Sequence, residues 1–401
     1  MRRIAITGIG SINSMGTGVG SFAEGLRQGR CAIDELTLFP TDGYRTSLAA
    51  EVRRIDVPPT VAPQIARRAS RTTALALVAA DEAWRMAALD TVDDVAVVLG
   101  TTTGGMTTGE ECYRRQLLGE RNRHALSQWL ETPISVPVDV VAQTFGCRGP
   151  RLTVATACSS GANALGLAAD WIRTGRASRV LCGGAEALCR MTYSGFNILQ
   201  ALDRQPCRPF DRRRAGLTLG EGAAVFAFED WERAHNRGAR ILAEFVSYGV
   251  SGDAHHLTQP RPDGAGAILA MRRALAEGGV APEEIDYVNA HGTGTLQNDA
   301  VETRVIKAVL GPRAHEIPVS STKSMVGHCL GAAGAIEALA CVLAMRDGFV
   351  PPTANLEQTD PECDLDYVPQ ASRSGALRTV LSNSYGFGGN NTSLILRRHE
   401  G

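Results

Sequence analysis

The sequence predicts an α/β fold built from two similar halves. Short apolar runs rich in β-branched residues end in glycine turns and alternate with helical segments along the whole chain. Such alternation is typical of mostly parallel sheets that are covered by helices. The succession of strand, small residues and Ala/Gly-rich helix over 153–174 returns over 317–346, which indicates an internal duplication. We therefore expect two closely packed halves, residues 1–239 and 240–401.

In the first half, each expected strand is a short apolar run that ends at a glycine or a turn. These runs are 3–12, 94–99, the stretch from Thr153, 179–184 and 221–230. Apolar residues at helical spacing predict helices at 21–29, 68–89 and 231–238, and within 106–146 around a polar middle at 119–124. Turn residues and prolines make 31–62 and 189–220 irregular. Gly8 and Gly10 lack the rest of the dinucleotide fingerprint, so we expect no nucleotide cofactor.

In the second half, four of the five expected strands lead into loops that carry polar or reactive side chains. The strands are expected at 240–249, 285–290, 317–321, 379–383 and 392–397, and helices at 264–278, 299–310 and 331–346. The side chains in the loops are Asp253, His291, Lys323 with His328, and Asn383. Ligands of open α/β sheets bind beyond the carboxyl ends of the strands, so this edge is the candidate site.

Composition restricts the class of protein. With 44% hydrophobic and 21% charged residues, the chain has the composition of an ordinary globular protein. Its net charge of −1 gives no overall electrostatic field that would attract nucleic acid or a membrane surface. Its ten cysteines contain no Cys-x-x-Cys pair, which favours a reducing compartment over disulfides or zinc. No apolar run approaches the ~20 residues of a membrane span, and the N-terminus lacks the apolar run of a signal peptide. We expect a cytoplasmic protein.

Cys158 occupies a strand-to-helix turn in the first half. It follows the apolar run 153–157, which we expect to be a buried strand, and a helix through Ile172 is expected to start after it. Backbone N–H groups and the dipole at a helix N-terminus favour an anion. We therefore expect a thiol with a lowered pKa that acts as a nucleophile. A buried structural cysteine is the competing interpretation of this stretch taken alone.

Cys158, His291, His328 and Lys323 together suggest thioester chemistry. A thiolate attacks carbonyl groups, and two neutral histidines can each donate an N–H group to a developing enolate oxygen. A cysteine hydrolase needs one histidine that Asn or Asp orients. That alternative leaves the second histidine and the lysine unexplained.

Four motifs carry a family resemblance. They are Ala157-Cys158-Ser-Ser-Gly, Asn289-Ala-His291-Gly-Thr-Gly-Thr, Ser321-Thr-Lys323-Ser-Met-Val-Gly-His328 and Asn383-Ser-Tyr-Gly-Phe387-Gly-Gly. In this order, over nearly the whole chain, they resemble the β-ketoacyl-acyl carrier protein synthases of the elongating, Cys-His-His type. The resemblance implies a thiolase-like fold with two pseudo-duplicated αβαβα halves. It also implies a homodimer, or a heterodimer with a paralogous synthase-like subunit.

The resemblance implies a decarboxylative Claisen condensation that needs no catalytic metal or diffusible cofactor. Cys158 would take an acyl group from the phosphopantetheine of an acyl carrier protein, and malonyl-carrier protein would then lose carbon dioxide. His291 and His328 would stabilise the enolate. The backbone N–H groups of Cys158 and Phe387 would form the oxyanion hole, and Phe387 would gate access. Lys323, paired with Glu337, would support His328.

The resemblance implies further roles for residues around these groups. Asp253 and Glu337 would surround the catalytic residues, and Thr103 and Phe196 would line the acyl pocket. A structural monovalent cation would be held by Asn289, Glu337, Ser382 and Asn383. An acidic carrier protein implies a basic docking patch, for which two groups of arginines are candidates: Arg67, Arg68 and Arg71, and Arg204, Arg208 and Arg212–Arg214.

Two positions depart from the family pattern. Thr103 stands where a larger aliphatic residue often lines the acyl pocket, and Leu217 replaces a phenylalanine common beside the catalytic residues. Both changes favour a polyene or aryl-polyene chain of secondary metabolism, with ordinary fatty acid elongation as the alternative. A non-catalytic partner subunit of a synthase heterodimer is the competing class, and the intact set of Cys158, His291, Lys323 and His328 argues against it.

Overall fold

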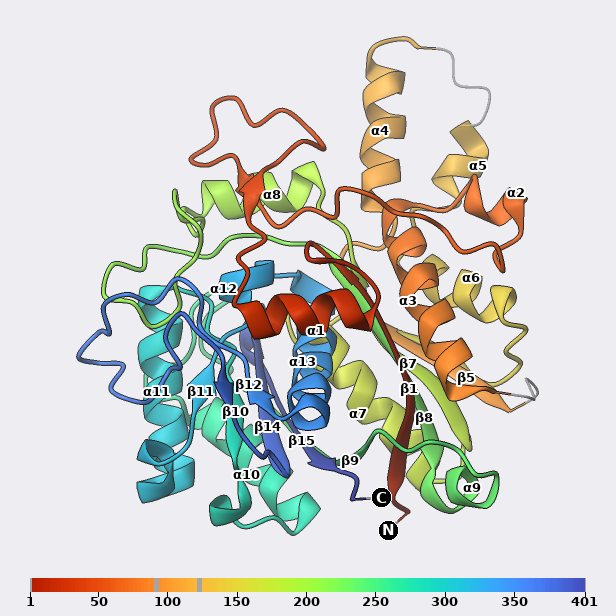
Figure 1. Ribbon diagram of the computed structural model, residues 1–401. Coiled ribbons are helices and arrows are strands. Elements are labelled where there is room, and N and C mark those ends of the chain that lie inside the picture. Colours follow the sequence, from red (N-terminus) through yellow and green to blue (C-terminus); the bar gives the residue numbers. More distant parts are fainter. Residues whose placement is uncertain (1, 90–93, 121–124, 401) are drawn as a thin grey trace.

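One large mixed sheet runs through the molecule. The structure is a computed structural model and describes residues 2–89, 94–120 and 125–400 (Figure 1). Its eleven-stranded sheet has the order β11-β10-β14-β15-β9-β1-β8-β7-β5-β6, with β2 paired to β1. The first-half strands are β1 (Ile4–Asn13), β5 (Val95–Gly100), β6 (Arg151–Val154), β7 (Arg179–Glu186) and β8 (Gly222–Asp230). The second-half strands are β9 (Ala243–Gly252), β10 (Tyr287–Asn289), β11 (Val319–Ser320), β14 (Thr379–Gly386) and β15 (Asn390–Arg398).

The order of the strands repeats between the two halves of the sheet. β5 pairs in parallel with β6 and β7, and β10 pairs in parallel with β11 and β14. β8 and β15 then add antiparallel neighbours, and β1 and β9 join the halves where Ile4 lies opposite Phe245. In each half four of the five strands run in the same direction, as expected for a mostly parallel sheet, and the exceptions are β8 and β15, which run back along β7 and β14. The boundary between residues 239 and 240 falls between α9 and β9 and stays a prediction.

Helices form three layers around the sheet (Figure 1). α7 (Ser160–Arg173) and α13 (Ala333–Asp347) lie in the middle, packed against strands of both halves. α3 (Arg71–Ala87) and α6 (Val136–Thr144) cover the first half, and α10 (Ala265–Gly278) and α11 (Leu296–Leu310) cover the second. The predicted αβαβα layering is thus present. The remaining helices are α1 (Val19–Gln28), α2 (Pro63–Ala66), α4 (Met106–Leu117), α5 (Ala125–Trp129), α8 (Arg190–Ile198), α9 (Trp231–Asn236) and α12 (Lys323–Val326).

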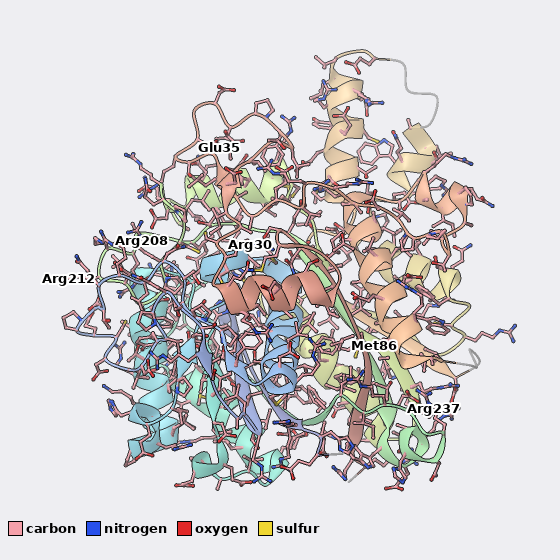
Figure 2. All side chains as sticks on the ribbon, in the orientation of Figure 1. Arg30, Glu35, Met86, Arg208, Arg212 and Arg237 are labelled. Carbon is pink, nitrogen blue, oxygen red and sulfur yellow. The ribbon has the colours of Figure 1, made fainter. Side chains whose placement is uncertain are left out.

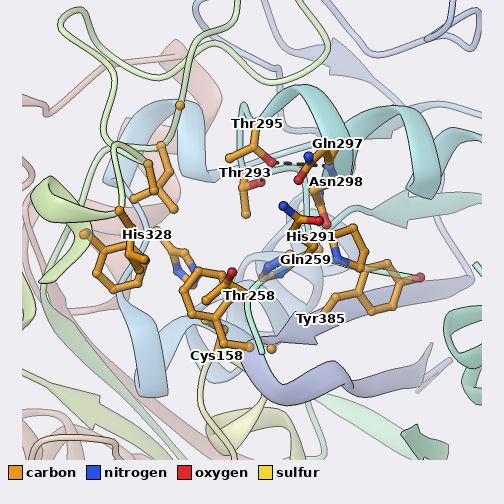
Figure 3. Close-up of a pocket in the computed structure, with 18 of the residues that line it drawn as sticks. Cys158, Thr258, Gln259, His291, Thr293, Thr295, Gln297, Asn298, His328 and Tyr385 are labelled. Atoms are coloured by element: carbon orange, nitrogen blue, oxygen red, sulfur yellow. Dashed lines mark hydrogen bonds between the residues drawn. The ribbon is translucent and has the colours of Figure 1, made fainter. Parts of the chain in front are cut away.

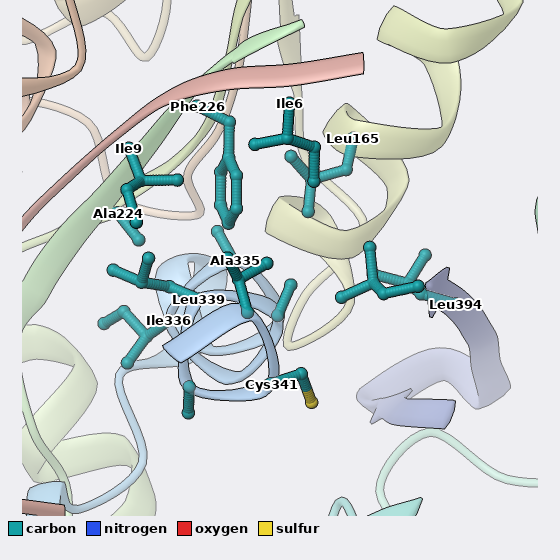
Figure 4. Packing of buried hydrophobic residues seen from close by; sticks show 14 of the residues in the cluster. Ile6, Ile9, Leu165, Ala224, Phe226, Ala335, Ile336, Leu339, Cys341 and Leu394 are labelled. Atoms are coloured by element: carbon teal, nitrogen blue, oxygen red, sulfur yellow. The ribbon is translucent and has the colours of Figure 1, made fainter. Parts of the chain in front are cut away.

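The central helix α13 is buried all round. Every residue from Ala333 to Met345 is buried, as expected for a helix without a polar face. Figure 4 shows Ile336 and Leu339 of α13 below Ile9 of β1, with Leu394 of β15 on another side of the helix. Small residues on α7 and α13 allow the two helices to approach closely, because a Cβ at Gly161 would lie 2.9 Å from the Ala335 nitrogen.

Three local expectations differ from the structure. The strand expected over 153–157 ends at Val154, and β6 is an edge strand in which Arg151 and Leu152 are exposed. Residues 189–220 were expected to be irregular, but 190–198 form the helix α8. The helix expected from 299 starts at Leu296, because the side chain of Thr295 accepts a hydrogen bond from the Asn298 N–H group and caps it. Of the polar middle expected at 119–124, residues 121–124 lie outside the described residues.

A search of the described residues found no helix with both the length and the apolar content that a membrane crossing needs.

Candidate active site

A strained turn presents Cys158 at the start of α7. After β6 the chain turns through Ala157, whose φ of 52° lies in the left-handed region that L-residues rarely adopt. Hydroxyl groups hold the turn: Ser159 donates to the Thr156 carbonyl at 2.9 Å and Ser160 donates to the Ala157 carbonyl at 2.6 Å. Cys158 follows as the last residue before the cap of α7, and its side chain lines a cavity.

The Cys158 thiol is protonated at neutral pH. Burial raises its pKa to about 11, although hydrogen bonding from the Phe387 backbone N–H group and the positive charge of Lys323 act to lower it. The expectation of a lowered pKa was therefore wrong, because removal of the thiolate from water outweighs the field at the helix terminus. The Phe387 N–H group nevertheless points at the sulfur, as an oxyanion donor should.

His291 follows β10 in a turn that a buried glutamate fixes. The backbone N–H groups of His291 and Gly292 both donate to the carboxylate of Glu302 at 2.8 Å. The Lys323 ammonium lies 3.2 Å from Nδ1 of His291. Because an ammonium can only donate, Nδ1 is the acceptor and the proton of the ring lies on Nε2.

His328 reaches the same tautomer by a different contact. Its Nδ1 accepts a hydrogen bond from the Leu330 backbone N–H group at 3.3 Å, so its ring proton is also on Nε2. The two imidazole rings lie edge to face with centroids 5.4 Å apart. Burial and the charge of Lys323 lower the pKa of both histidines well below the usual value. Both rings are thus neutral Nε2–H donors.

Lys323 contacts His291 rather than His328, which corrects the expectation that it supports His328. Its ammonium bridges His291 and the carboxylate of Glu337, and the predicted Lys323–Glu337 pair is present. Both side chains are buried, and burial raises the pKa of Glu337 to about 7 against the effect of Lys323. A buried pair of this kind costs desolvation, and here it orients an imidazole ring.

Phe387 closes over the nucleophile at the end of β14. Gly386 packs against the turn below it, since a Cβ at Gly386 would lie 3.1 Å from the Cys158 nitrogen and 3.0 Å from the Thr156 carbonyl oxygen. The ring of Phe387 stacks on Phe196 of α8, with centroids 5.4 Å apart and an angle of 24° between the planes. Two aromatic rings from different halves of the chain therefore cover one side of the cavity.

These residues surround a single cavity of about 370 Å³. Cys158, His291 and His328 lie at its base, and Figure 3 shows that Thr293, Thr295, Gln297 and Asn298 gather on one side above them. Phe196, Leu199, Leu217 and Phe387 form an apolar side. A ligand with a polar stem and an apolar end fits such a lining.

Two predicted residues of this region, Thr103 and Asp253, differ in whether they line the cavity. Thr103 is not among the residues that line the cavity, because its hydroxyl and backbone N–H groups donate to the buried carboxylate of Glu186. Asp253 does line the cavity, and it accepts hydrogen bonds from the Asn391 side chain at 2.7 Å and the Arg261 backbone N–H group at 3.0 Å. The assignment of Thr103 to the acyl pocket stays a prediction.

Three of the four predicted cation ligands carry buried oxygen atoms without a hydrogen-bond partner. They are Oδ1 of Asn289, Oε2 of Glu337 and Oγ of Ser382. Hard cations bind oxygen ligands of this kind, so the donor set fits a cation. Asn383 differs, because its Oδ1 accepts from Ser393 at 2.8 Å and its Nδ2 donates to Glu302 at 3.3 Å.

The predicted docking arginines divide into exposed and structural ones. Arg67 and Arg68 are exposed, but Arg71 forms a two-pronged ion pair with the buried Glu221 at 2.8 and 2.5 Å. Arg214 is buried as well. Arg71 and Arg214 are therefore structural and not docking residues. Figure 2 shows Arg208 and Arg212 on the same flank of the molecule, and Arg204, Arg212 and Arg213 are exposed.

The prediction missed buried charges that shape the site. Glu302 fixes the His291 turn, Glu186 binds Thr103 and the Gly331 backbone N–H group, and Arg214 contacts the loop before α11. Of the three, only Glu186 interrupts a run of small and apolar residues, Gly183-Gly-Ala-Glu-Ala-Leu188. Since charged residues are almost never fully buried without a partner, that interruption was an available signal for Glu186, whereas Glu302 and Arg214 lie among other polar residues.

Comparison with known proteins agrees with this geometry. The β-ketoacyl synthase N-terminal domain model matches residues 1–234 and the C-terminal domain model matches residues 242–357. The class defined by the fold and the site is thus that of ketosynthases. The chain belongs to the β-ketoacyl synthase family.

Individual relatives span the whole chain. A 3-oxoacyl-[acyl-carrier-protein] synthase 2 of Synechocystis sp. is 38% identical and covers 100% of this chain and 99% of the relative. A putative polyketide beta-ketoacyl synthase 1 of Streptomyces cyaneus is 42% identical and covers 98% of both. The solved structure of the ishigamide ketosynthase/chain length factor matches with a TM-score of 0.92 and 37% identity over 100% of both chains.

Proposed function

We propose that the protein catalyses decarboxylative Claisen condensation between an acyl group on Cys158 and a malonyl group on a carrier protein. The observation that carries this proposal is the placement of two neutral Nε2–H donors, His291 and His328, above a buried thiol in one cavity. A hydrolase would use one histidine as a base. Two N–H donors without a general base are an arrangement that stabilises an oxyanion.

In the first half-reaction, the acyl group moves from the phosphopantetheine thiol of the carrier protein to Cys158. The sulfur of Cys158 attacks the thioester carbonyl, whose oxygen accepts hydrogen bonds from the backbone N–H groups of Cys158 and Phe387. The carbon–sulfur bond to the carrier breaks, and the proton of the Cys158 thiol ends on the departing pantetheine thiol. No net proton is gained or lost, so a thiol that is protonated at rest suits this exchange.

In the second half-reaction, malonyl-carrier protein replaces the first carrier. The bond between the carboxylate and the methylene carbon breaks, carbon dioxide leaves, and the electron pair forms an enolate whose oxygen lies between Nε2 of His291 and Nε2 of His328. The enolate carbon attacks the carbonyl carbon of acyl-Cys158. The bond to the Cys158 sulfur then breaks, and one proton from solvent restores the thiol. The product is a 3-oxoacyl group on the carrier protein.

In this proposal, Phe387 and Phe196 control the sequence of the two half-reactions by controlling entry to the cavity. Their stacked rings cover the sulfur and must separate before an acyl chain enters between them. The 370 Å³ cavity accommodates the pantetheine end of the arm. Leu217 on its apolar side is smaller than a phenylalanine and leaves space beside Cys158 for a fatty acyl or a stiffer polyene-type chain.

The partner of this reaction is an acyl carrier protein, which delivers both substrates on phosphopantetheine. The exposed arginines of the two predicted groups bind the carrier protein. They are Arg67, Arg68, Arg204, Arg212 and Arg213, with the half-buried Arg208. The protein acts as a dimer with itself or with a paralogous subunit. A reducing compartment, the cytoplasm, suits its free thiols, because all ten cysteines lie in the described residues without a disulfide.

A monovalent cation bound by Asn289, Glu337 and Ser382 would satisfy their buried oxygen atoms. When bound, it supplies a positive charge that stabilises the carboxylate of Glu337. Glu337 in turn holds Lys323 against His291. Asn383 supports this group through Ser393 and Glu302 rather than through a free oxygen.

Intact-protein mass spectrometry after incubation with a panel of acyl-carrier proteins tests the proposal. We expect one acyl adduct per chain on the wild type and on Cys31→Ala, whose thiol is half-exposed and lies outside the cavity, and none on Cys158→Ala. Release of free acid without an adduct on the protein would instead support a hydrolase. An assembled system that elongates equally well with Cys158→Ala would support a partner subunit.

A further inference from the structure

A buried glutamate joins two loops of the active-site region. Glu186, the last residue of β7, is fully buried and is not among the residues that line the cavity. Its carboxylate accepts hydrogen bonds from the loop that follows β5 and from the segment that follows His328. Burial of a carboxylate is costly unless donors satisfy it, and here N–H and O–H groups converge on it from both sides. The proposed condensation assigns no task to Glu186.

The loop after β5 supplies most of these donors. The N–H groups of Thr102 and Thr103 donate to Glu186 at 2.7 and 3.0 Å. The hydroxyl groups of Thr101, Thr102 and Thr103 donate to it as well. Three consecutive residues thus face one carboxylate, so the position of the carboxylate is fixed by this loop.

On its other side, Glu186 holds the backbone of Gly331. The Gly331 N–H group donates to Oε2 of Glu186 at 3.0 Å. Gly331 also lies close to the loop after β5, since a Cβ there would lie 2.7 Å from the Thr102 nitrogen and 2.8 Å from the Thr101 Cα. A side chain at position 331 would have to displace that loop. The absence of one allows the glutamate to hold both segments at once.

The residue before Gly331 is strained and orients an imidazole ring. Leu330 has a φ of 44°, in the left-handed region that a leucine rarely adopts. Its N–H group donates to Nδ1 of His328 at 3.3 Å, which places the ring proton on Nε2. Strain of this kind persists only where the surroundings hold it. The contact that holds the peptide after Leu330 is the hydrogen bond from Gly331 to Glu186.

We propose that Glu186 is a positioning residue that selects the tautomer of His328. By holding Gly331, it keeps Leu330 in its left-handed conformation, with the Leu330 N–H group directed at Nδ1 of the ring. Without this restraint Leu330 relaxes, and Nδ1 is free to carry the ring proton. Nε2 then presents a lone pair, instead of an N–H group, to the enolate oxygen. This inference rests on the proposed condensation and concerns only its second half-reaction, because acylation of Cys158 uses backbone N–H groups.

The rates of the two half-reactions, measured separately by rapid quench and intact-protein mass spectrometry, test the proposal. Glu186→Gln keeps the shape of the side chain but replaces one acceptor oxygen by an NH2 group that faces other donors. We expect the condensation of preformed acyl-Cys158 with malonyl-carrier protein to slow about tenfold, because the ring loses one orienting hydrogen bond. The rate of acyl-Cys158 formation should stay within about twofold of the wild type.

Nitrogen-15 NMR of the histidine rings reports the tautomer directly. In the wild type, Nε2 of His328 should give the signal of a protonated nitrogen and Nδ1 that of an unprotonated one, and both should vanish in His328→Asn. In Glu186→Gln the two signals should move toward each other as the Nδ1–H tautomer becomes populated. The signals of His291 should not move, because its Nδ1 faces Lys323.

Glu229→Gln is the matched control. Glu229 is equally buried, but it lies at the other end of the β7–β8 pair, where it forms an ion pair with Arg237. We expect this variant to have a lower midpoint of thermal unfolding, with the wild-type condensation rate and His328 signals. If Glu186→Gln does not fold, Glu186→Asp decides, because it keeps the charge but is too short to reach both loops.

Equal slowing of both half-reactions, an unchanged condensation rate, or unchanged His328 signals in Glu186→Gln would overturn the inference. The same outcomes decide for Glu186→Asp if it is the variant that is measured. Failure of the proposed function has a different signature, since the wild type itself would then form no 3-oxoacyl-carrier protein.

Discussion

Individual residues set the protonation of the cavity. Burial lowers the pKa of His291 and His328 well below the usual value and raises the pKa of Cys158 to about 11. All three groups are therefore neutral at pH 7. The histidines donate through Nε2 because Lys323 and the Leu330 N–H group occupy their Nδ1 atoms. Polarity in the cavity is thus supplied by oriented N–H groups and not by a charge on the rings.

The raised pKa of Cys158 predicts how its alkylation depends on pH. With a pKa of about 11, the thiolate fraction rises about tenfold for each pH unit between about pH 7 and 9. We expect the rate of iodoacetamide labelling at Cys158 to rise by the same factor over this range, with Cys158→Ala to subtract labelling at Cys31. A rate that levels off below about pH 8 would mean that the field at the α7 terminus outweighs burial after all.

His328 should make the protein less stable in acid. Its folded pKa lies below the unfolded value of about 6.5, so below that pH the unfolded chain binds a proton that the folded chain does not. Stability is lost as the pH falls. His328→Asn removes this loss, and relative to wild type it should gain about 1 kcal/mol between about pH 6.5 and about pH 5.5.

Urea denaturation at the two pH values measures this difference. Glu302 and Glu337 have pKa values raised to about 7 by burial, which gives the opposite slope, but both are present in both proteins and cancel in the comparison. His315→Asn, at an exposed histidine, is the control and should show no such shift. An equal stability difference at both pH values would contradict the buried, neutral state of His328.

Sequence patterns identified the reactive residues but not the groups that orient them. Cys158, His291, Lys323, His328 and Phe387 were predictable because each lies in a turn after an apolar run, and the structure brings them to one cavity or its wall. The histidine that Lys323 contacts was not predictable, because which imidazole it faces depends on the packing of α12 and α13. The hydrogen bonds of Thr103 were not predictable for the same kind of reason: its side-chain direction depends on the buried Glu186 of another strand.

At the scale of elements, two turns make the site by their close approach. The start of α7 carries Cys158, and the end of β14 carries Phe387. Gly386 lies where they meet, and a Cβ at this position would press on the Cys158 nitrogen at 3.1 Å. The distance between the sulfur and the Phe387 N–H group therefore depends on one absent side chain.

Gly386→Ala should slow acylation without unfolding the protein. Its φ of −100° suits any residue, so the only cost is the displacement of the turn by a few tenths of an ångström. We expect the rate of acyl-Cys158 formation to fall on the order of tenfold. Gly195→Ala on α8 is the control, since a Cβ there meets nothing within 4 Å. Equal rates for the two variants would contradict the role of this contact.

Most elements were predictable from the sequence, and the exceptions have physical reasons. Short apolar runs that end at a turn identified β5, β7 and β10, because buried strands concentrate apolar residues. α8 was missed because Gly195 and Thr192 lower its helix propensity, and packing of Tyr193 and Phe196 stabilises it instead. The strand predicted over 153–157 extends beyond the end of β6, because an apolar run does not show where the turn that carries Cys158 begins.

At the scale of the whole molecule, the internal duplication determines the architecture. The order β6-β5-β7-β8-β1 has its counterpart in β11-β10-β14-β15-β9, so Cys158 and the histidines extend from matching strand ends in two similar halves of the sheet. The repeat of strand, small residues and helix made the duplication predictable. The antiparallel strands did not show in the sequence, because β8 and β15 have the same apolar composition as their parallel neighbours.

Two surface features are those of an interface. β6 is an edge strand with unpaired backbone groups, and α4 and α5 expose Tyr113, Leu117, Leu118, Leu126 and Trp129. Unprotected edges and apolar patches of this kind mark association surfaces. We therefore predict that the protein sediments as a dimer.

Leu117→Asp with Leu126→Asp should yield monomers in analytical ultracentrifugation. Both side chains are more than half exposed, at 69% and 76%, so the charges cost the folded monomer little. Leu269→Asp, on α10 in the other half, is the control and should leave the dimer intact. A wild type that sediments as a monomer, or a double variant that stays dimeric, would assign association to another surface.

The most direct test of the central claim is the mass of the carrier protein after one full turnover. Wild-type protein, an acyl-carrier protein and malonyl-carrier protein should give a 3-oxoacyl-carrier protein that is longer by one two-carbon unit, with one carbon dioxide released for each product. His328→Ala should still form acyl-Cys158 but should release neither. Free acid as the product, or equal elongation by Cys158→Ala, would contradict the account.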